Sequence, residues 1–386
     1  MNEGSGARRA AVIDWLSQQQ EEMRALLALL VDIDSHSHDK AGVDAVGEAI
    51  SEWCKAMGIE VRRTPRPRFG DLFEACLGEG EGTVVLLGHR DTVFPTGTVA
   101  ERSYEEHDGM AFGPGVADMK GGLVMNLFVL AALARTGGLA FPLKAVFTAD
   151  EEIGSPDGKA LIEDAVRHAR AVFNAEPGRV SGNLVTGRKG GANLVLEVSG
   201  RAAHSGVSHA DGVSAIEALA RKIQRIHALT DYDTGVTTNV GVIEGGTSSN
   251  TVAPWARARI DTRFVTFEQR EALFAALEEI AAREELPGTQ ATLTQVSGFL
   301  PLERAMSEAL LARYQRSAAE LGFEVEGEFT GGCSDAGTTA SLGIPTLCGT
   351  GPVGALMHTE REYLLLSSLV PRAQALALTL LDLDEG

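Results

Sequence analysis

The strongest constraint in this sequence is a set of short apolar, strand-like segments that each lead to a histidine or an acidic side chain. These are residues 83–87 followed by His89, residues 143–148 followed by Glu152, and residues 171–173 followed by Glu176. Helical patterns separate the segments, and strand–helix alternation of this kind predicts a mostly parallel sheet with helices on both faces. The carboxyl ends of such strands share one edge, where open α/β sheets bind ligands. We therefore expect an α/β fold with its chemistry at that edge.

The pattern changes between residues 192 and 296. Strand-like and helical segments there follow the order β-α-β-β-α-β, which is the ferredoxin-like α+β arrangement. We predict that this second domain is inserted into the first. The expected boundaries are residues 1–190 for the first part of the catalytic domain, 191–298 for the inserted domain and 299–386 for the second part.

Composition narrows the function classes. The 386 residues carry a formal net charge of -19, and nucleic acids or anionic membranes are bound by basic faces, so we expect neither partner. The amino-terminal residues include acids and glutamines where a signal peptide would be apolar, which predicts a cytoplasmic protein. The four cysteines lie far apart without the spacing of a zinc site, so we expect reduced, mostly buried thiols.

Nitrogen and oxygen donors follow the predicted strands or lie in glycine-rich turns. They are His89, Asp118, Glu152, Glu176 and His358. This donor set suits two divalent ions of borderline character, with zinc as the first choice and cobalt or manganese as alternatives. We predict that Asp118 bridges the ions, that Asp91 orients His89, and that Glu151 is the general base.

Each motif alone has an ordinary structural explanation. A histidine two residues before an aspartate is commonly a hydrogen-bonded pair, residues 150–152 could be an acidic helix start, and residues 357–360 a solvated loop. Residues 35–39 (SHSHD) contain two histidines and an acid, and we interpret them as a polar connection between two helices. The metal-site prediction depends on all the donors occurring together.

The segments GHRDTVFP, FGPGVADMKGG, TADEEIGS, NAEPG, RAAHSG and MHTERE occur in this order. Together they resemble the M20 family of zinc metallopeptidases, most closely its glutamate carboxypeptidase (carboxypeptidase G2-like) branch. The resemblance implies a catalytic domain with two zinc ions per subunit and an inserted lid and dimerisation domain. It also implies that His89, Asp118, Glu152, Glu176 and His358 are the metal ligands, with Asp91 as the orienting acid and Glu151 as the base.

The resemblance extends to the inserted domain. It implies that His204 reaches the partner subunit's active site in a homodimer and stabilises the oxyanion, a role whose structural alternative is a polar loop histidine. Asn250 resembles a substrate contact, and Arg263 is either a fork for a substrate carboxylate or part of a structural salt bridge. Glutamate-specific members carry a lysine after the NAEP-type motif. Here the nearby residues are Arg179, Asn183 and the pair Arg188-Lys189, none of which matches that lysine.

The function we expect is hydrolysis of an amide next to a free carboxylate, in an N-acyl amino acid or a short peptide. Alternatives with the same fold are an acetylornithine deacetylase or succinyl-diaminopimelate desuccinylase-like deacylase and a dipeptidase. An alternative from another class is a non-catalytic dimeric scaffold. Loss of ligands would mark such a scaffold, and this sequence retains the whole set.

Overall fold

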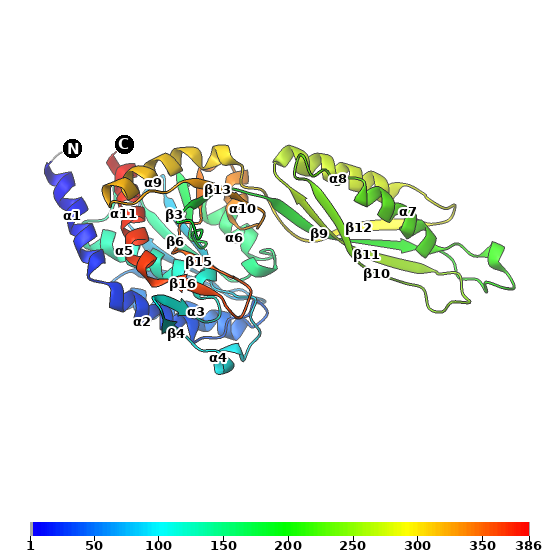
Figure 1. Ribbon diagram of the computed structural model, residues 1–386, viewed down its shortest axis with the longest axis horizontal. Helices are drawn as coiled ribbons and strands as arrows, with labels where there is room; N and C mark the ends of the chain where they lie inside the picture. Colours follow the sequence, from blue (N-terminus) through cyan, green and yellow to red (C-terminus); the bar gives the residue numbers. More distant parts are fainter. Residues whose placement is uncertain (1–2, 386) are drawn as a thin grey trace. The chain divides into compact units, whose positions relative to one another are not determined.

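The computed structural model describes residues 3–385. The chain divides into two compact units (Figure 1). Unit 1 comprises the chain up to Gly187, Glu303–Thr330 and the chain from Ser334 onward. Unit 2 comprises Arg188–Leu302 together with the short segment Gly331–Cys333. Unit 2 is therefore an insertion between two parts of unit 1.

Unit 1 is built on an eight-stranded sheet. Its strands, in spatial order, are β1 (Glu60–Thr64), β2 (Leu72–Leu77), β6 (Leu143–Thr148), β3 (Val84–His89), β7 (Ala171–Asn174), β14 (Thr346–Cys348), β8 (Leu184–Arg188) and β13 (Gly327–Thr330). The four central strands β6, β3, β7 and β14 pair in parallel. The outer pairings of β1 with β2, β2 with β6 and β8 with β14 are antiparallel. The predicted parallel centre is confirmed.

Helices cover both faces of this sheet because its strands are apolar on both sides. Along β3, Val84 and Leu86 belong to the core packed by α3 (Lys40–Ala56), α5 (Gly121–Arg135) and α11 (Leu369–Glu385). Val85 and Leu87 belong to the core packed by α6 (Gly158–Ala165). Such period-two alternation is what a strand buried on both faces requires. The helices of unit 1 are α1 (Glu3–Ser17), α2 (Gln20–Val31), α3 (Lys40–Ala56), α4 (Thr98–Glu101), α5 (Gly121–Arg135), α6 (Gly158–Ala165), α9 (Glu308–Glu320), α10 (Ala336–Ser341) and α11 (Leu369–Glu385).

A small antiparallel sheet joins distant parts of unit 1. Its order is β15 (Gly354–Ala355), β16 (Tyr363–Leu365), β5 (Met110–Phe112) and β4 (Glu105–His107). β16 pairs with β5 in the register Tyr363 to Phe112. This pairing brings the loop that contains His358 close to the turn that contains Asp118. Single helical turns occupy Val116–Lys120, Glu151–Ile153, His209–Asp211, Arg304–Met306 and Leu366–Ser368.

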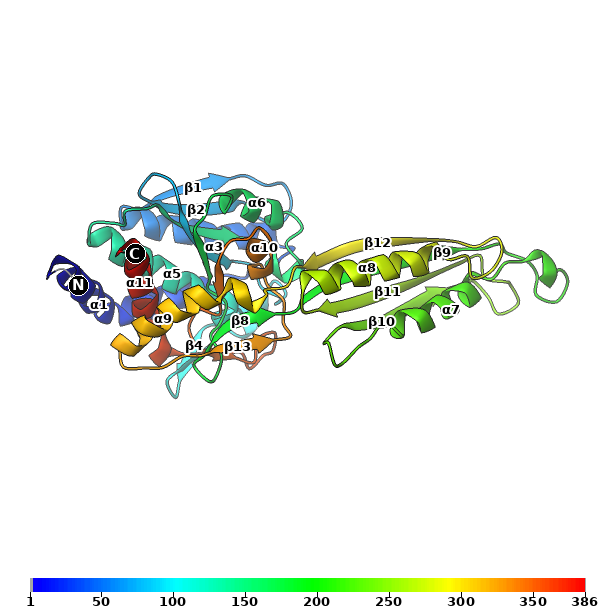
Figure 2. The ribbon, with the colours of Figure 1, turned by 90° about the horizontal axis from the view of Figure 1, so that it is seen from above.

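Unit 2 is a four-stranded antiparallel sheet with two helices on one face (Figure 2). Along the chain its elements are β9 (Gly190–Ser199), α7 (Ala215–His227), β10 (Thr237–Gly245), β11 (Trp255–Phe264), α8 (Phe267–Ala282) and β12 (Gln290–Phe299). The spatial order β10-β11-β9-β12 is that of the predicted ferredoxin-like arrangement. In β11, Ala256, Ala258 and Ile260 alternate with more exposed residues and pack in the same core as α7 and α8.

The sequence pattern predicts a closing helix over residues 362–381, and this prediction is wrong at the start of the helix. We expected it to begin at Glu362, but Tyr363–Leu365 forms strand β16 and helix α11 begins at Leu369. Pro371 lies in the first turn of α11, where a proline is tolerated, whereas the predicted helix would have placed it in the interior. The proline was therefore the sequence signal for the true boundary.

The sequence pattern also predicts helical structure over residues 8–30, a helix from Leu302 and a strand over residues 323–328, and the structure differs from each of these predictions. The single helical pattern over residues 8–30 is two helices, α1 and α2, that break at Gln18–Gln19. The helix predicted to start at Leu302 starts at Glu308, after a bend in which Leu302 pairs with Arg188. The strand predicted over residues 323–328 is β13 at Gly327–Thr330, because the preceding residues close the end of α9, where Phe323 N–H donates to Ala318 O.

The segment Val116–Arg135 is long and apolar enough to cross a membrane by length and composition. It is 94% buried inside the folded structure. It is therefore a core helix, consistent with its packing against α11 and β3.

Candidate metal centre

Three neighbouring parallel strands end at one edge of the large sheet, and each places a predicted donor there. β3 ends at His89, the turn after β6 contains Glu151 and Glu152, and the segment after β7 contains Glu176. Because the sheet order is β6-β3-β7, these side chains are neighbours although they are far apart in sequence. This is the strand-end convergence predicted from the sequence.

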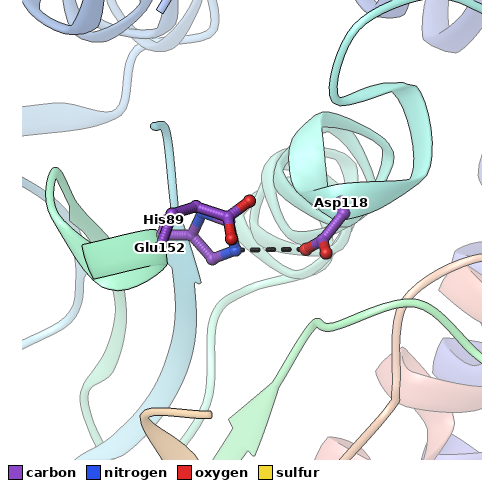
Figure 3. Close-up of side chains that lie close together, drawn as sticks. All are labelled: His89, Asp118 and Glu152. Carbon is purple, nitrogen blue, oxygen red and sulfur yellow. Dashed lines mark hydrogen bonds and ion pairs between the residues drawn. The ribbon is translucent and has the colours of Figure 1, made fainter. Parts of the chain in front are cut away.

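Asp118 lies between the two predicted histidine ligands. Its Oδ1 is 3.2 Å from Nε2 of His89, and its Oδ2 is 3.3 Å from Nε2 of His358. Nε2 of His358 is also 3.2 Å from Oε2 of Glu152. Figure 3 shows His89, Asp118 and Glu152 pointing toward one another. One carboxylate thus faces a different imidazole with each of its oxygens.

The remaining predicted donor lies on the His89 side of Asp118. Nε2 of His89 is 3.9 Å from Oε1 of Glu176 and 4.0 Å from Oε2 of Glu151. Two overlapping groups of side chains offer donor atoms close enough to hold a metal ion: His89 with Asp118 and Glu152, and His89 with Glu151 and Glu176. The structure therefore brings all five predicted ligands and the predicted base into one cluster.

The ring of His89 has a defined orientation. Its Nδ1 lies 2.9 Å from the backbone carbonyl oxygen of Asp91, and a carbonyl can only accept a hydrogen bond. Nδ1 therefore carries the proton, which leaves the lone pair of Nε2 free to bind a metal ion. The backbone carbonyl of Asp91 accepts from this nitrogen, and the Asp91 carboxylate, predicted to orient His89, also lies 3.4 Å from Nδ1.

The Asp91 carboxylate also connects the segments that carry the ligands. It is fully buried and accepts hydrogen bonds from Ser37 Oγ at 2.7 Å and from the N–H groups of Glu151 and Glu152 at 3.1 Å each. Ser37 belongs to the SHSHD segment, which we interpreted as a polar connection. Its Oγ contact with Asp91 is a positioning role that sequence spacing did not reveal.

Glycine permits a close approach between two of these segments. A Cβ added at Gly122, in the first turn of α5, would lie 2.0 Å from the carbonyl oxygen of Ala175. Any larger residue at this position would push the Asp118 turn away from the strand end that precedes Glu176. Packing against Ala175 therefore explains the glycine at position 122.

The electrostatics of the cluster are dominated by burial and by like charges. Burial and, after it, the neighbouring Asp118 carboxylate raise the pKa of Glu152 to about 7. Burial likewise raises the pKa of Glu151 well above its usual range, and Glu176 and Asp335 act in the same direction. The pKa of His358 rises to about 10 because it contacts Asp118 and Glu152.

The raised pKa values of these carboxyl groups indicate whether the cluster is suited to binding a cation. Several carboxylates crowded in a buried pocket disfavour one another's ionised form, and a divalent cation between them removes that penalty. Imidazole nitrogen and carboxylate oxygen are also the donors that zinc and related ions bind. The cluster therefore fits a divalent metal centre in both charge and donor chemistry.

Two buried acids near the cluster were not singled out from the sequence as functional. Asp335 accepts a hydrogen bond from Ser155 Oγ at 2.5 Å, and burial raises its pKa to about 7. Glu362 accepts hydrogen bonds from the N–H groups of Ala117 and Asp118. Glu362 lies four positions after His358 in the MHTERE motif, and that proximity was the available signal.

The three predicted residues of unit 2 divide into two groups. The segment of His204 pairs with that of Thr251, and Ser205 N–H donates to Asn250 O at 2.9 Å, so His204 and Asn250 belong to neighbouring loops. Both loops lie beyond the Trp255 end of β11, whereas Arg263 is near its other end. At about 3.4 Å per residue, this separation is roughly 27 Å or more. Within one chain, Arg263 and Asn250 cannot bind the same carboxylate.

His204 and Arg263 also differ in their local contacts. Nδ1 of His204 accepts a hydrogen bond from the N–H of Gly206 at 3.1 Å, so the neutral ring carries its proton on Nε2. Arg263 forms a fork with Asp261 through Nε at 3.0 Å and Nη2 at 2.9 Å. Its Nη1 is 2.9 Å from Sγ of Cys333. In this structure Arg263 has the structural ion pair that we named as its alternative role.

Comparisons with known proteins agree with this geometry. Residues 85–382 match the model of peptidase family M20/M25/M40. The chain is 27% identical over 381 residues to carboxypeptidase G2 of Pseudomonas sp. (strain RS-16), covering 96% of this chain and 91% of that protein.

Solved structures are similar in fold. Aminopeptidase PepT from Bacillus cereus ATCC 10987 matches with a TM-score of 0.76 at 23% identity, covering 94% of this chain and 98% of that chain. The M20 family metallo-carboxypeptidase Sso-CP2 from Sulfolobus solfataricus matches with a TM-score of 0.75 at 18% identity, covering 93% and 98%. A hydrolase of this family uses divalent metal, and the described residues include a donor cluster suited to it. The chain is therefore a hydrolytic enzyme that belongs to peptidase family M20/M25/M40.

Proposed function

We propose that this enzyme is a dizinc carboxypeptidase or N-acyl amino acid hydrolase that cleaves an amide next to a free carboxylate. The observation that carries the proposal is the position of Asp118, whose two oxygens face the Nε2 atoms of His89 and His358. A carboxylate in this position is suited to bridging two cations. The likeness to a carboxypeptidase over nearly the whole chain supports the substrate class.

The proposed ligands form two sets that share Asp118. His89 and Glu176 lie on one side of it, and Glu152 and His358 lie on the other. The chemistry supplied by two bound divalent cations is polarisation of the scissile carbonyl and acidification of a water molecule. Zinc is the ion we propose, because nitrogen and carboxylate ligands suit it, and cobalt or manganese could replace it.

Glu151 is the proposed general base. It lies beside the proposed ligands, and its Oε2 is 4.0 Å from Nε2 of His89. Burial and neighbouring carboxylates raise its pKa, which favours holding a proton taken from water and returning it to the leaving amine. In this scheme Asp91 holds the backbone of Glu151 in place through the N–H at 3.1 Å.

Binding of the substrate is assigned to unit 2. His204 would donate its Nε2–H to the oxyanion, and the contact between its Nδ1 and Gly206 supports that tautomer. Because His204 and Asn250 lie at the opposite end of β11 from Arg263, we propose that each active site combines residues of two subunits. The proposed assembly is a cytoplasmic homodimer formed through unit 2.

Replacement of Glu151 tests the proposed mechanism. Glu151→Ala should lower kcat by about 100- to 10,000-fold while the metal content stays near two per chain, because this residue moves a proton and is not a proposed ligand. Steady-state kinetics and metal analysis of the same preparations would measure both effects. Asp164 forms an exposed ion pair with Arg167, so Asp164→Ala is a negative control that should behave like the wild type. Undiminished turnover in Glu151→Ala would exclude this base.

The substrate class is tested by hydrolysis of N-acyl amino acids in which the acyl half and the amino acid half are varied separately. Cleavage that requires the free carboxylate supports the proposal. Preferential cleavage of acetylornithine, succinyl-diaminopimelate or unblocked dipeptides would favour a deacylase or a dipeptidase instead.

A further inference from the structure

Glu362 contacts the backbone of the turn that carries the central carboxylate of the metal site. It is 0% exposed, and its Oε1 accepts hydrogen bonds from the N–H of Ala117 at 2.9 Å and the N–H of Asp118 at 3.0 Å. We propose that Glu362 is a positioning residue that holds Asp118 so that its two carboxylate oxygens serve two cations. This inference rests on the proposed dinuclear site and extends it to a residue outside the ligand set.

The backbone around Asp118 requires such a partner. Asp118 has φ -112° and ψ 90°, and Met119 has φ -132° and ψ 37°, which are not helical values although both lie within the helical turn Val116–Lys120. A distorted turn cannot pair all its N–H groups internally, and a buried N–H without an acceptor destabilises the folded state. A single oxygen of Glu362 satisfies two adjacent N–H groups and thereby selects this conformation of the turn.

The small antiparallel sheet delivers Glu362 to this place. Glu362 directly precedes β16, whose Tyr363 pairs with Phe112 of β5, and β5 leads into the Asp118 turn. The contact joins residues separated by 244 positions in the chain. Its geometry therefore depends on the sheet register, which also places the loop before β16 next to the same turn.

The loop before β16 carries His358 as well. The N–H of Glu362 donates to Thr359 O at 3.2 Å, and Thr359 Oγ1 donates to Leu356 O at 2.6 Å, so residues 356–362 form a closed turn. His358 has a φ of 62°, which is uncommon for a residue other than glycine. One compact loop thus contacts Asp118 twice, through its N–H with Glu362 and through its carboxylate with His358.

This arrangement uses a side-chain oxygen that lies within hydrogen-bond distance of the turn. It does not depend on the negative charge of Glu362. Oε2 of Glu362 has no hydrogen-bond partner within residues 3–385. Glu362→Gln keeps an oxygen at the same distance from the backbone of the turn. Glu362→Asp keeps the charge but shortens the side chain by one methylene group, and Glu362→Leu removes the acceptor.

Metal binding separates these variants. Metal-free wild type and variants would be titrated with zinc, with the stoichiometry and affinity measured by equilibrium dialysis, and the visible spectrum of the cobalt-loaded proteins recorded. We expect two cations per chain in the wild type and in Glu362→Gln. Glu362→Leu should bind one of the two cations about 10- to 100-fold more weakly and show an altered cobalt spectrum.

Glu74 provides the matched control. It is a buried acid of unit 1 whose Oε1 pairs with Lys144 at 3.0 Å instead of with a backbone turn. Glu74→Gln and Glu74→Leu should lose thermal stability without changing zinc stoichiometry or the cobalt spectrum. If Glu362→Leu does not fold, cation binding by Glu362→Gln and Glu362→Asp tests the positioning role. Only the glutamine side chain is long enough to place an oxygen next to both N–H groups.

The outcomes are distinct. Wild-type cation binding by Glu362→Leu, equal loss in Glu362→Gln and Glu362→Leu, or tighter binding by Glu362→Asp than by Glu362→Gln would each overturn the positioning role. Failure of the wild type itself to bind two cations would instead refute the proposed dinuclear function. The inference is supported if the cobalt spectrum and the zinc affinity stay like the wild type in Glu362→Gln and change in Glu362→Leu.

Discussion

At the scale of single residues, side chains beneath the ligands organise the candidate site. The Asp91 carboxylate accepts hydrogen bonds from the hydroxyl of Ser37 and from the N–H groups of the two glutamates that follow β6. The carboxylate is fully buried, so each of these hydrogen bonds is made to a charged group shielded from water. Loss of one of them should displace the proposed base and ligand together.

Ser37→Ala tests this positioning role. Removing a hydrogen bond to a buried charged group costs about 1.5–3 kcal/mol, and we expect kcat/KM to fall by roughly 10-fold or more. Ser35→Ala is a matched control, because Ser35 is equally buried and its hydroxyl has no hydrogen-bond partner among the described residues. Kinetics that are equal for the two variants would contradict the role of Ser37.

At the scale of elements, the strand that delivers His89 is anchored by the residue next to it. Arg90 is fully buried, and its guanidinium donates to backbone carbonyls of Val43, Asp71 and Thr148. These carbonyls belong to α3, to the residue before β2 and to β6. A single side chain therefore fixes three elements around the end of β3, where the site begins.

Asp71 extends this anchor with charged partners. Its Oδ1 accepts from Lys40 Nζ at 2.6 Å, and its Oδ2 accepts from Arg63 Nε at 2.6 Å. Burial opposes ionisation, but Lys40, the N–H of Arg66 and Arg63 outweigh it and lower the pKa of Asp71 to about 2. Because the pKa is lower in the folded state than in the unfolded chain, this stabilisation is complete above the unfolded pKa and is lost as the pH falls toward 2.

Asp71→Asn should therefore lower the free energy of unfolding by about 2 kcal/mol at neutral pH. The difference from the wild type should shrink between about pH 5 and pH 2, and urea unfolding of the metal-free proteins across this range would measure it. Asp164→Asn, in an exposed ion pair, should show almost no difference at any pH. A difference for Asp71→Asn that does not change with pH would contradict the assignment.

At the scale of the whole molecule, the two units have separate apolar cores. Leu196 of β9 packs with α7 and α8 in unit 2, whereas the core around α5 and α11 belongs to unit 1. All the proposed metal ligands lie in unit 1. Metal binding and unit 2 packing should therefore stabilise different parts of the chain.

Calorimetry of the metal-free and metal-loaded enzyme tests this separation. Zinc at about 100 times its dissociation constant should stabilise the unit 1 transition by about 2.7 kcal/mol for each cation bound. Leu196→Ala should destabilise the unit 2 transition by about 2–5 kcal/mol and leave the zinc-dependent shift unchanged. A single transition that moves equally with zinc and with Leu196→Ala would show that the units unfold together.

The separation of His204 from Arg263 in unit 2 leads to a test of the proposed composite site. Glu151→Ala and His204→Ala should each be nearly inactive, but mixing and reassociating them should restore activity. In a mixed dimer, one site would receive its own Glu151 and the partner's intact histidine. If His204 acted within its own chain, no site in the mixture would be complete and activity would stay low. An enzyme that is active as a strict monomer in sedimentation would also contradict the assembly.

Much of this protein could be predicted from local sequence patterns. Apolar runs that end in His89, Glu152 and Glu176 predicted parallel strands with converging ends, because period and composition determine which segments are buried strands. The order of elements in unit 2 was predicted on the same basis. Pro371 was a local signal for the start of the closing helix, and the predicted start did not take it into account.

The rest depended on contacts between residues far apart in the chain. Pairing of β16 with β5 brings Glu362 to the Asp118 turn, and burial of Ser37 brings its hydroxyl to Asp91. Neither pairing has a periodic signal, because a hydrogen bond between distant segments leaves no mark on the local hydrophobic pattern. The sequence by itself determined the strand ends and the types of donor side chain. Only the tertiary structure decided which buried polar groups hold those donors in place, since that depends on sheet register and on how the segments pack in three dimensions.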